Sequence, residues 1–396
     1  MSQRFQSTIP KWLTPVLLGV IALTHALYVY FSGVKMCPDC YWYAEQADKL
    51  IDNKFNIFRV SAEIYENMYL AWIAALSLIK VLFGPFWQYG VLAFNFILDL
   101  FLAFLVIRIV QHASSHLFVL LITAGLFLIS FENILWVSFV LADTSFTALT
   151  FGVLCLSVSL SSPGSGLRTP WLLAATACLT MLALIYRPTA IPLIPLIALV
   201  FVTSLFIDAE DVKKRGSRAR LITLIVAIAG VVSVIVHTYV IQKMLGSDFV
   251  EPSVRIISKL YGEGVVIHGR LETYHNPPES LLDIAAITLN KFFHYFVFSI
   301  DAFSLKHKVA NYFFFLPVYA LTVVTLFELY RKESCLSPQA WRTAFLSAAF
   351  ILFFALYHSM TILDYDWRYR LPCIPPFIVL AGIGSERVYS YLKASS

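Results

Sequence analysis

The run "WLTPVLLGVIALTHALYVYF" at residues 12–31 contains no Asp, Glu, Lys or Arg. At a helical rise of about 1.5 Å per residue, a run of this length covers the roughly 30 Å hydrocarbon core of a bilayer. The run lacks a cleavage site of small residues, which favours a retained membrane-spanning helix over a signal peptide that is removed. The sequence therefore predicts a membrane protein with its first span near the beginning of the chain.

The remainder of the chain continues this apolar pattern. Of the 396 residues, 59% are hydrophobic and 13% are charged, and the mean hydropathy is +0.76, which a water-soluble domain of this size could not bury. The net charge of +5 forms no basic stripe, which argues against a nucleic-acid partner. We expect a single all-α polytopic membrane domain over 1–396 with ten spans, at about 12–31, 88–110, 117–138, 143–160, 171–189, 190–207, 221–241, 311–330, 341–362 and 371–390.

One further apolar segment, "IYENMYLAWIAALSLIKVLF" at 64–83, has the length of a span but carries Glu66 and Lys80 near its ends. The linker 208–220 is rich in Lys and Arg, which marks a cytoplasmic loop. An eleventh span would put the basic loops on opposite sides, so we expect 64–83 to lie in the outer interface as an amphipathic helix. This topology predicts cytoplasmic termini, localisation to the plasma (inner) membrane, and two extracytoplasmic regions at 32–87 and 242–310.

Charged side chains gather at the outer ends of the predicted spans. Each of them alone is equally well explained by a helix end that reaches into the lipid headgroups. Together they fit transfer of a group from a lipid phosphate, in which guanidinium groups hold the phosphate and a carboxylate acts as general base on an acceptor hydroxyl. The set consists of Asp39, Asp143, Arg187, Asp364, Asp366, Arg368 and Arg370.

Other polar residues have structural interpretations. The histidines of 242–310 have no metal-ligand spacing, so we expect no protein metal site, although a divalent metal could assist the reaction. Cys37 and Cys40 in "CPDC" could form a disulfide, a redox pair or two free thiols, and we expect free or loosely paired thiols. We expect interhelical hydrogen bonds from the polar residues inside spans, namely Asn95, Asp99, Glu132 and Asn133.

Four stretches of the chain carry a resemblance to a known family. They are, in order along the chain, "PDCYWYAEQADKL" (38–50), "ADTSFTALTFGVL" (142–154), "LALIYRPTAIPLIPL" (182–196) and "DWRYRLPCIPPFIVLAGIG" (366–384). In this order and topology they resemble the GT-C glycosyltransferases of the protein-mannosyltransferase and aminoarabinose-transferase type. These polytopic enzymes take a sugar from a polyprenyl-phosphate carrier on the outer face of the membrane.

The resemblance implies a membrane glycosyltransferase with a polyprenyl-phosphate sugar as donor and a lipid, glycan or protein as acceptor. It places Asp39 as the catalytic base of an inverting transfer and Asp143 as a second acid. A lipid-linked oligosaccharide ligase and a transporter or flippase are the alternatives, although the chain shows no internal repeat of the kind common in transporters. We expect substrate contacts from Arg187, Arg368, Arg370, Tyr41 and Tyr43.

Overall fold

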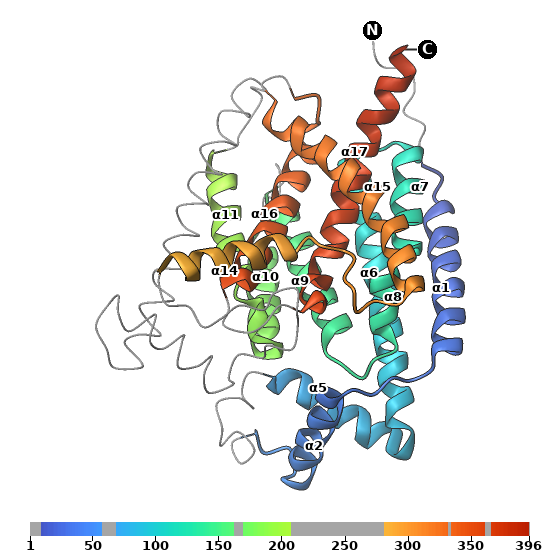
Figure 1. Cartoon of the computed structure of the whole chain (residues 1–396), viewed down its shortest axis with the longest axis vertical. Helices are drawn as coiled ribbons and strands as arrows, with labels where there is room; N and C mark the ends of the chain where they lie inside the picture. Colours follow the sequence, from blue (N-terminus) through green and yellow to red (C-terminus); the bar gives the residue numbers. More distant parts are fainter. Residues whose placement is uncertain are drawn as a thin grey trace.

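The computed structural model describes residues 9–57, 69–161, 169–206, 281–331, 334–360 and 366–395. These residues form helices and connecting turns, with one isolated β-bridge between Lys35 and Phe139. Most helices run roughly along one axis, and the start of α1 and the end of α17 lie at the same end of this bundle (Figure 1). The described part of the chain therefore has the all-α architecture that the sequence predicts.

Several helices have the length and composition of membrane spans. Within the described residues six segments qualify, and a seventh is obtained if a pair bent by 49° counts as one span. The protein is therefore a multi-pass membrane protein, although the predicted count of ten is not confirmed, and the predicted span 221–241 lies outside the described residues. The main helices are α1 (Leu13–Ser32), α6 (Trp87–Ala113), α9 (Asp143–Leu160), α15 (Leu305–Tyr330), α16 (Pro338–Met360) and α17 (Ile374–Ser395), with the bent pair α7 (Leu117–Leu128) and α8 (Phe131–Val137) and the shorter apolar helices α10 (Thr169–Tyr186) and α11 (Leu193–Phe206).

Helix α17 forms the centre of the bundle and contacts α15, α16 and α7. Gly384 allows the closest of these approaches, because a Cβ atom at this position would collide with the carbonyl oxygen of Leu321 in α15. The Thr325 hydroxyl also donates to the carbonyl of Leu380 across 2.7 Å. Small residues and hydroxyls are typical of helix contacts in membranes, where lipid removes most of the hydrophobic driving force for association.

Buried polar side chains connect helices, as predicted for the second span. His25 Nδ1 of α1 lies 2.6 Å from Asp99 Oδ2 of α6, and both side chains are almost completely buried. Asn95 of α6 donates to the backbone carbonyl of Val137, the last residue of α8, over 3.4 Å, and to that of Phe139 over 3.0 Å. The interhelical hydrogen bonds expected of Asn95 and Asp99 are therefore confirmed.

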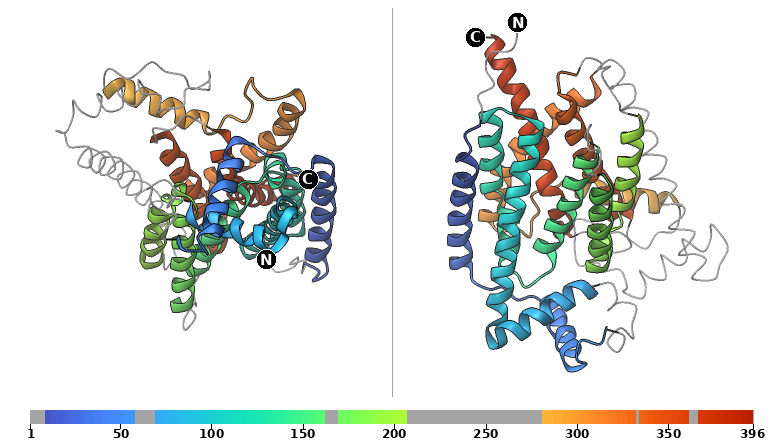
Figure 2. Two further views of the ribbon diagram at one scale, coloured as in Figure 1. Left: turned by 90° about the horizontal axis from the view of Figure 1, so that it is seen from below. Right: turned by 180° about the vertical axis from the view of Figure 1, so that it is seen from behind.

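Two helices lie across the lower end of the bundle, α2 (Pro38–Asp52) and α5 (Leu70–Phe83), as the view from behind in Figure 2 shows. Lys80 of α5 pairs with Asp48 of α2 at 2.5 Å, and Ser77 donates to the carbonyl of Ala47 at 3.1 Å. Helix α5 exposes apolar side chains such as Leu82. The short 3-10 helix η1 (Gly84–Phe86) connects α5 to α6. The interfacial position of 64–83 stays a prediction, because α5 and α6 together (Leu70–Ala113) also have the composition of a membrane span.

Candidate functional site

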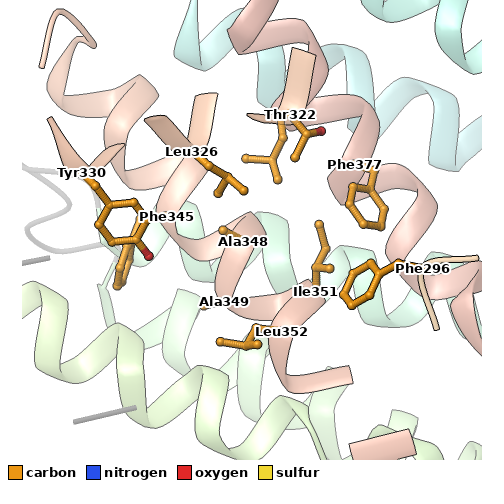
Figure 3. Close-up of a pocket in the computed structure, with 11 residues that line it drawn as sticks. Phe296, Thr322, Leu326, Tyr330, Phe345, Ala348, Ala349, Ile351, Leu352 and Phe377 are labelled. Atoms are coloured by element: carbon orange, nitrogen blue, oxygen red, sulfur yellow. The ribbon is translucent and has the colours of Figure 1, made fainter. Parts of the chain in front are cut away.

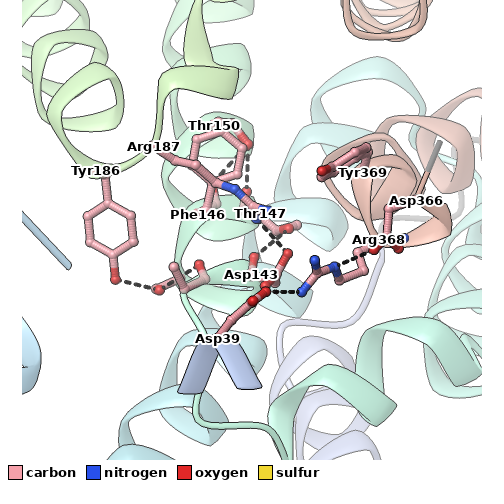
Figure 4. A network of polar contacts seen from close by, with 12 residues as sticks. Asp39, Asp143, Phe146, Thr147, Thr150, Tyr186, Arg187, Asp366, Arg368 and Tyr369 are labelled. Atoms are coloured by element: carbon pink, nitrogen blue, oxygen red, sulfur yellow. Dashed lines mark hydrogen bonds and ion pairs between the residues drawn. The ribbon is translucent and has the colours of Figure 1, made fainter. Parts of the chain in front are cut away.

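Charged residues from four segments meet at the end of the bundle that carries α2 (Figure 4). Asp39 lies in the first turn of α2, and Asp143 begins α9. Arg187 links α10 to the short 3-10 helix η3 (Pro188–Ala190), and Arg368 lies in the 3-10 helix η5 (Trp367–Cys373). We call these four residues, with Asp366, the ionic cluster. Asp364, which the sequence placed beside them, lies outside the described residues.

Arg368 is held between two carboxylates. Its Nη1 atom lies 2.8 Å from Asp39 Oδ2, and its Nε atom lies 2.8 Å from Asp366 Oδ2. Asp366 also caps η5, because its other carboxylate oxygen accepts from the backbone N–H of Arg368 at 3.0 Å. The Asp39 side chain is 50% exposed and that of Arg368 is 21% exposed, so a substrate could reach both groups.

Asp143 and Arg187 form the buried half of the ionic cluster. The Asp143 Oδ1 and Arg187 Nη1 atoms are 2.5 Å apart, and the side chains are 4% and 10% exposed. The Arg187 guanidinium lies 5.7 Å from the centre of the Phe146 ring and 5.9 Å from that of Tyr369. Among the described residues its Nε–H has no hydrogen-bond partner, although it is buried. Arg187 therefore keeps a donor available for an anion.

Asp143 lies at the start of α9 but does not cap the helix. A carboxylate at this position could have accepted hydrogen bonds from the free N–H groups of the first turn. The helix instead has Ala142 at its N-cap, with no side-chain cap, and the carboxylate turns toward Arg187. A buried guanidinium attracts a carboxylate more strongly than the N–H dipoles of a helix turn do, which explains the difference.

An apolar pocket begins beside the buried half of the cluster. The Tyr186 hydroxyl donates to Ser145 Oγ at 2.5 Å, and Ser145 is two residues from Asp143. Both residues also line a pocket of about 390 Å³ between α6, α9 and α10. The other lining residues are apolar side chains of these helices, including Phe94, Phe101, Ala148, Gly152, Leu179 and Leu182.

The two tyrosines expected at the site have different surroundings. Tyr43 is buried and packs in an aromatic group with Trp42, Tyr69 and Trp72. Burial raises the pKa of the Tyr43 phenol well above its ordinary value, and the nearby Arg187 opposes this only in part, so the phenol stays neutral. Tyr41 is exposed and is not brought to the cluster. Two residues along a helix turn a side chain by about 200°, which separates Tyr41 from the face that carries Asp39 and Tyr43.

Arg370 is not part of the ionic cluster. Its side chain is fully buried, and Nη2 lies 2.6 Å from Glu132 Oε1 of α8. The substrate contact expected of Arg370 therefore stays a prediction, and in this structure its guanidinium pairs with Glu132 instead. In a 3-10 helix with three residues per turn, residues 368 and 370 point in different directions, so only Arg368 faces the cluster. Sequence analysis did not predict Glu132 as the partner of Arg370. A carboxylate inside a predicted span was nevertheless a signal, because a buried carboxylate needs a cationic partner.

Cys37 and Cys40 form a disulfide with their Cα atoms 5.0 Å apart. The prediction of free or loosely paired thiols is wrong. Cys37 is the N-cap residue of α2 and Cys40 lies in its first turn, and the turn brings the two side chains within bonding distance. The disulfide encloses Asp39 and so restrains the backbone that presents this carboxylate.

A second apolar pocket, of about 260 Å³, lies between α15, α16 and α17, away from the ionic cluster (Figure 3). Phe296, Phe345 and Phe377 contribute aromatic walls, and the hydroxyl groups of Thr322 and Tyr330 are the polar features of its lining. Among the described residues, no group of three or more His, Cys, Asp or Glu side chains is arranged to hold a metal ion.

The geometry of the ionic cluster suits chemistry on an anionic, membrane-anchored substrate. It combines one accessible carboxylate, two guanidinium groups and an adjacent apolar pocket. Arg368 is close enough to Arg187 and Asp143 to interact with both electrostatically. Two neighbouring guanidinium groups repel each other unless an anion or carboxylates lie between them.

No protein-family model, protein of curated function or solved structure matches the chain.

Proposed function

We propose that the protein is a membrane glycosyltransferase that moves a sugar from a polyprenyl-phosphate donor to an acceptor hydroxyl on the extracytoplasmic face. The observation that carries the proposal is the ionic cluster, in which the accessible pair Asp39–Arg368 adjoins the buried pair Asp143–Arg187 at one end of the bundle. The order of the sequence motifs around these residues, which resembles the GT-C enzymes, supports the same proposal.

In the proposed reaction, the acceptor hydroxyl gives its proton to the carboxylate of Asp39. The acceptor oxygen then forms a bond to the anomeric carbon, while the bond from this carbon to the phosphate oxygen breaks and its electron pair stays on the phosphate. Arg368 and the Nε–H of Arg187, which has no hydrogen-bond partner among the described residues, stabilise the charge that develops on the phosphate. Attack opposite the leaving phosphate inverts the configuration of the anomeric carbon.

The apolar pocket between α6, α9 and α10 supports a lipid-linked donor. A prenyl chain has no hydrogen-bonding groups, and the pocket presents apolar side chains along most of its wall. Its polar lining consists of Ser145 and Tyr186, of which Tyr186 directly precedes Arg187 and Ser145 follows Asp143 by two residues. A carrier whose chain occupied the pocket would therefore have its phosphate beside the guanidinium groups.

The test is sugar transfer by the purified protein in liposomes, with a panel of polyprenyl-phosphate sugars and hydroxyl-bearing lipids, glycans and peptides as acceptors. We expect release of polyprenyl phosphate in step with transfer, and loss of both in Asp39→Asn. Ala148→Leu, which narrows the apolar pocket, should raise KM for a long-chain donor more than for the same sugar on a short prenyl phosphate. Movement of intact donor between leaflets without release of sugar would contradict the proposal and favour a flippase.

A further inference from the structure

A second group of buried polar residues lies directly behind the ionic cluster. Arg370 Nη2 lies 2.6 Å from Glu132 Oε1, and the two side chains are 0% and 1% exposed. Asn311 Nδ2 donates to the same carboxylate oxygen at 3.0 Å, and Arg370 Nη1 donates to the backbone carbonyl of Val297. The Arg370 guanidinium also lies 4.4 Å from the centre of the Phe315 ring.

This group joins segments that are distant in sequence. Glu132 belongs to α8 and Asn311 to α15, while Val297 follows α14 (Leu281–His294) and Arg370 belongs to η5. The fork of a guanidinium fixes both position and direction when two of its nitrogens have acceptors. Arg370 thus anchors a short 3-10 segment, a type of helix with weak internal hydrogen bonding, to three other parts of the bundle.

Stability alone does not account for such a group. Removing two charges from water is costly, and an apolar pair of similar volume at a buried site is often as stable as the ion pair or more so. The ion pair does, however, determine the orientation of η5. Arg368 lies two residues before Arg370 and contacts Asp39, while Tyr369 lies over the Arg187 guanidinium. The direction of η5 therefore determines the geometry of the ionic cluster.

We propose that Glu132 and Arg370 are positioning residues, whose buried ion pair holds η5 so that Arg368 faces Asp39 and Tyr369 covers Arg187. The proposal rests on the proposed function for its effect on activity, but its structural part stands independently of the reaction. Neither residue touches the substrate in this arrangement. Their effect is transmitted through the backbone of Trp367–Cys373.

The test replaces the ion pair by apolar residues of similar volume, Glu132→Leu with Arg370→Met. Hydrogen–deuterium exchange reports on η5 directly, and the exchange of peptides covering 367–373 should become at least about tenfold faster, as expected for easier local opening. In the transfer assay kcat should fall by about 10²-fold, because small misplacements of catalytic groups have effects of this size. Glu132→Asp, which keeps the charge, should recover part of both losses.

The matched control is another buried polar pair, His25–Asp99, whose side chains are 0% and 1% exposed and which joins α1 to α6. The double variant His25→Leu with Asp99→Leu should leave the exchange of 367–373 and kcat unchanged.

If the protein with Glu132→Leu and Arg370→Met does not fold, Glu132→Gln takes its place, because it keeps the volume and one acceptor. Wild-type exchange and activity in whichever folded variant is used would overturn the proposal. Absence of transfer by the wild-type protein would instead count against the proposed function, and the exchange comparison would still decide the role of the ion pair.

Discussion

Replacement of Asp39 and of Asp143 by Asn should separate catalysis from stability. Both changes remove one carboxylate charge from the ionic cluster and keep the volume of the side chain. The two carboxylates differ in exposure, since the Asp39 side chain is 50% exposed and that of Asp143 is 4% exposed. We expect Asp39→Asn to abolish transfer with little effect on folding, and Asp143→Asn to destabilise the protein with a milder effect on transfer.

The magnitudes follow from these environments. Exposed ion pairs contribute about 0.2–1 kcal/mol, so Asp39→Asn should lower the free energy of unfolding by less than about 1 kcal/mol. Breaking a buried pair costs about 3–5 kcal/mol, because the partner is left charged and buried. Asn at 143 still offers Arg187 an acceptor oxygen, which reduces the expected loss to about 2–3 kcal/mol. Loss of a general base lowers the rate by about 10²–10⁴-fold, which is the expectation for Asp39→Asn.

The assay combines transfer in liposomes with denaturant unfolding in detergent for the same preparations. Wild-type protein and Asp99→Asn provide references, the latter for loss of a buried charge remote from the ionic cluster. Donor binding should persist in Asp39→Asn, because Arg187 and Arg368 remain. An Asp39→Asn protein within tenfold of wild-type activity would falsify its assignment as the base. Equal stability of Asp143→Asn and wild type would refute the argument from burial.

Three further outcomes are expected. Arg368→Lys keeps the charge but loses the planar fork, so donor KM should rise by about 30- to 160-fold, equivalent to about 2–3 kcal/mol, while folding is retained; an unchanged KM in the transfer assay would remove Arg368 from the site. Cys37 and Cys40 should resist alkylation until the protein is reduced, as peptide mass spectrometry can show, and alkylation of the unreduced protein would contradict the disulfide. In a chain without its exposed free cysteines, an impermeant thiol reagent added to intact cells should label a cysteine placed at Tyr41 but not one at Lys393, and the reverse pattern would invert the topology.

Sequence analysis predicted that the members of the ionic cluster lie near one another, and the structure brings them together. Asp39, Asp143, Arg187 and Arg368 each lie at a boundary between an apolar run and a polar segment. Counting spans between these boundaries placed all four at the same end of the bundle, and the structure brings them together there. Their proximity could be predicted because the depth of a residue depends only on the number and length of apolar segments.

Rotation about the helix axis and the choice of partner could not be predicted in the same way. Arg368 and Arg370 are equivalent in composition and depth, yet one contacts Asp39 and the other is buried against Glu132. The difference arises because the segment before α17 is a 3-10 helix. The prolines in this part of the sequence argue against a regular α-helix, but they do not show which conformation replaces it. No local pattern revealed that a carboxylate in α8 would lie opposite Arg370.

The sequence alone therefore determined that this chain is helical and crosses a membrane several times, because long apolar runs must satisfy their backbone hydrogen bonds internally. It also predicted that the residues of the ionic cluster lie near one another, because charges avoid the hydrocarbon core. Tertiary structure decided which charges pair. It buried the Asp143–Arg187 pair, left Asp39 accessible and placed an apolar pocket beside them. These outcomes depend on the packing of α2, α9, α10 and η5 against one another, and contacts between segments so distant in sequence have no counterpart in the periodicity of any single segment.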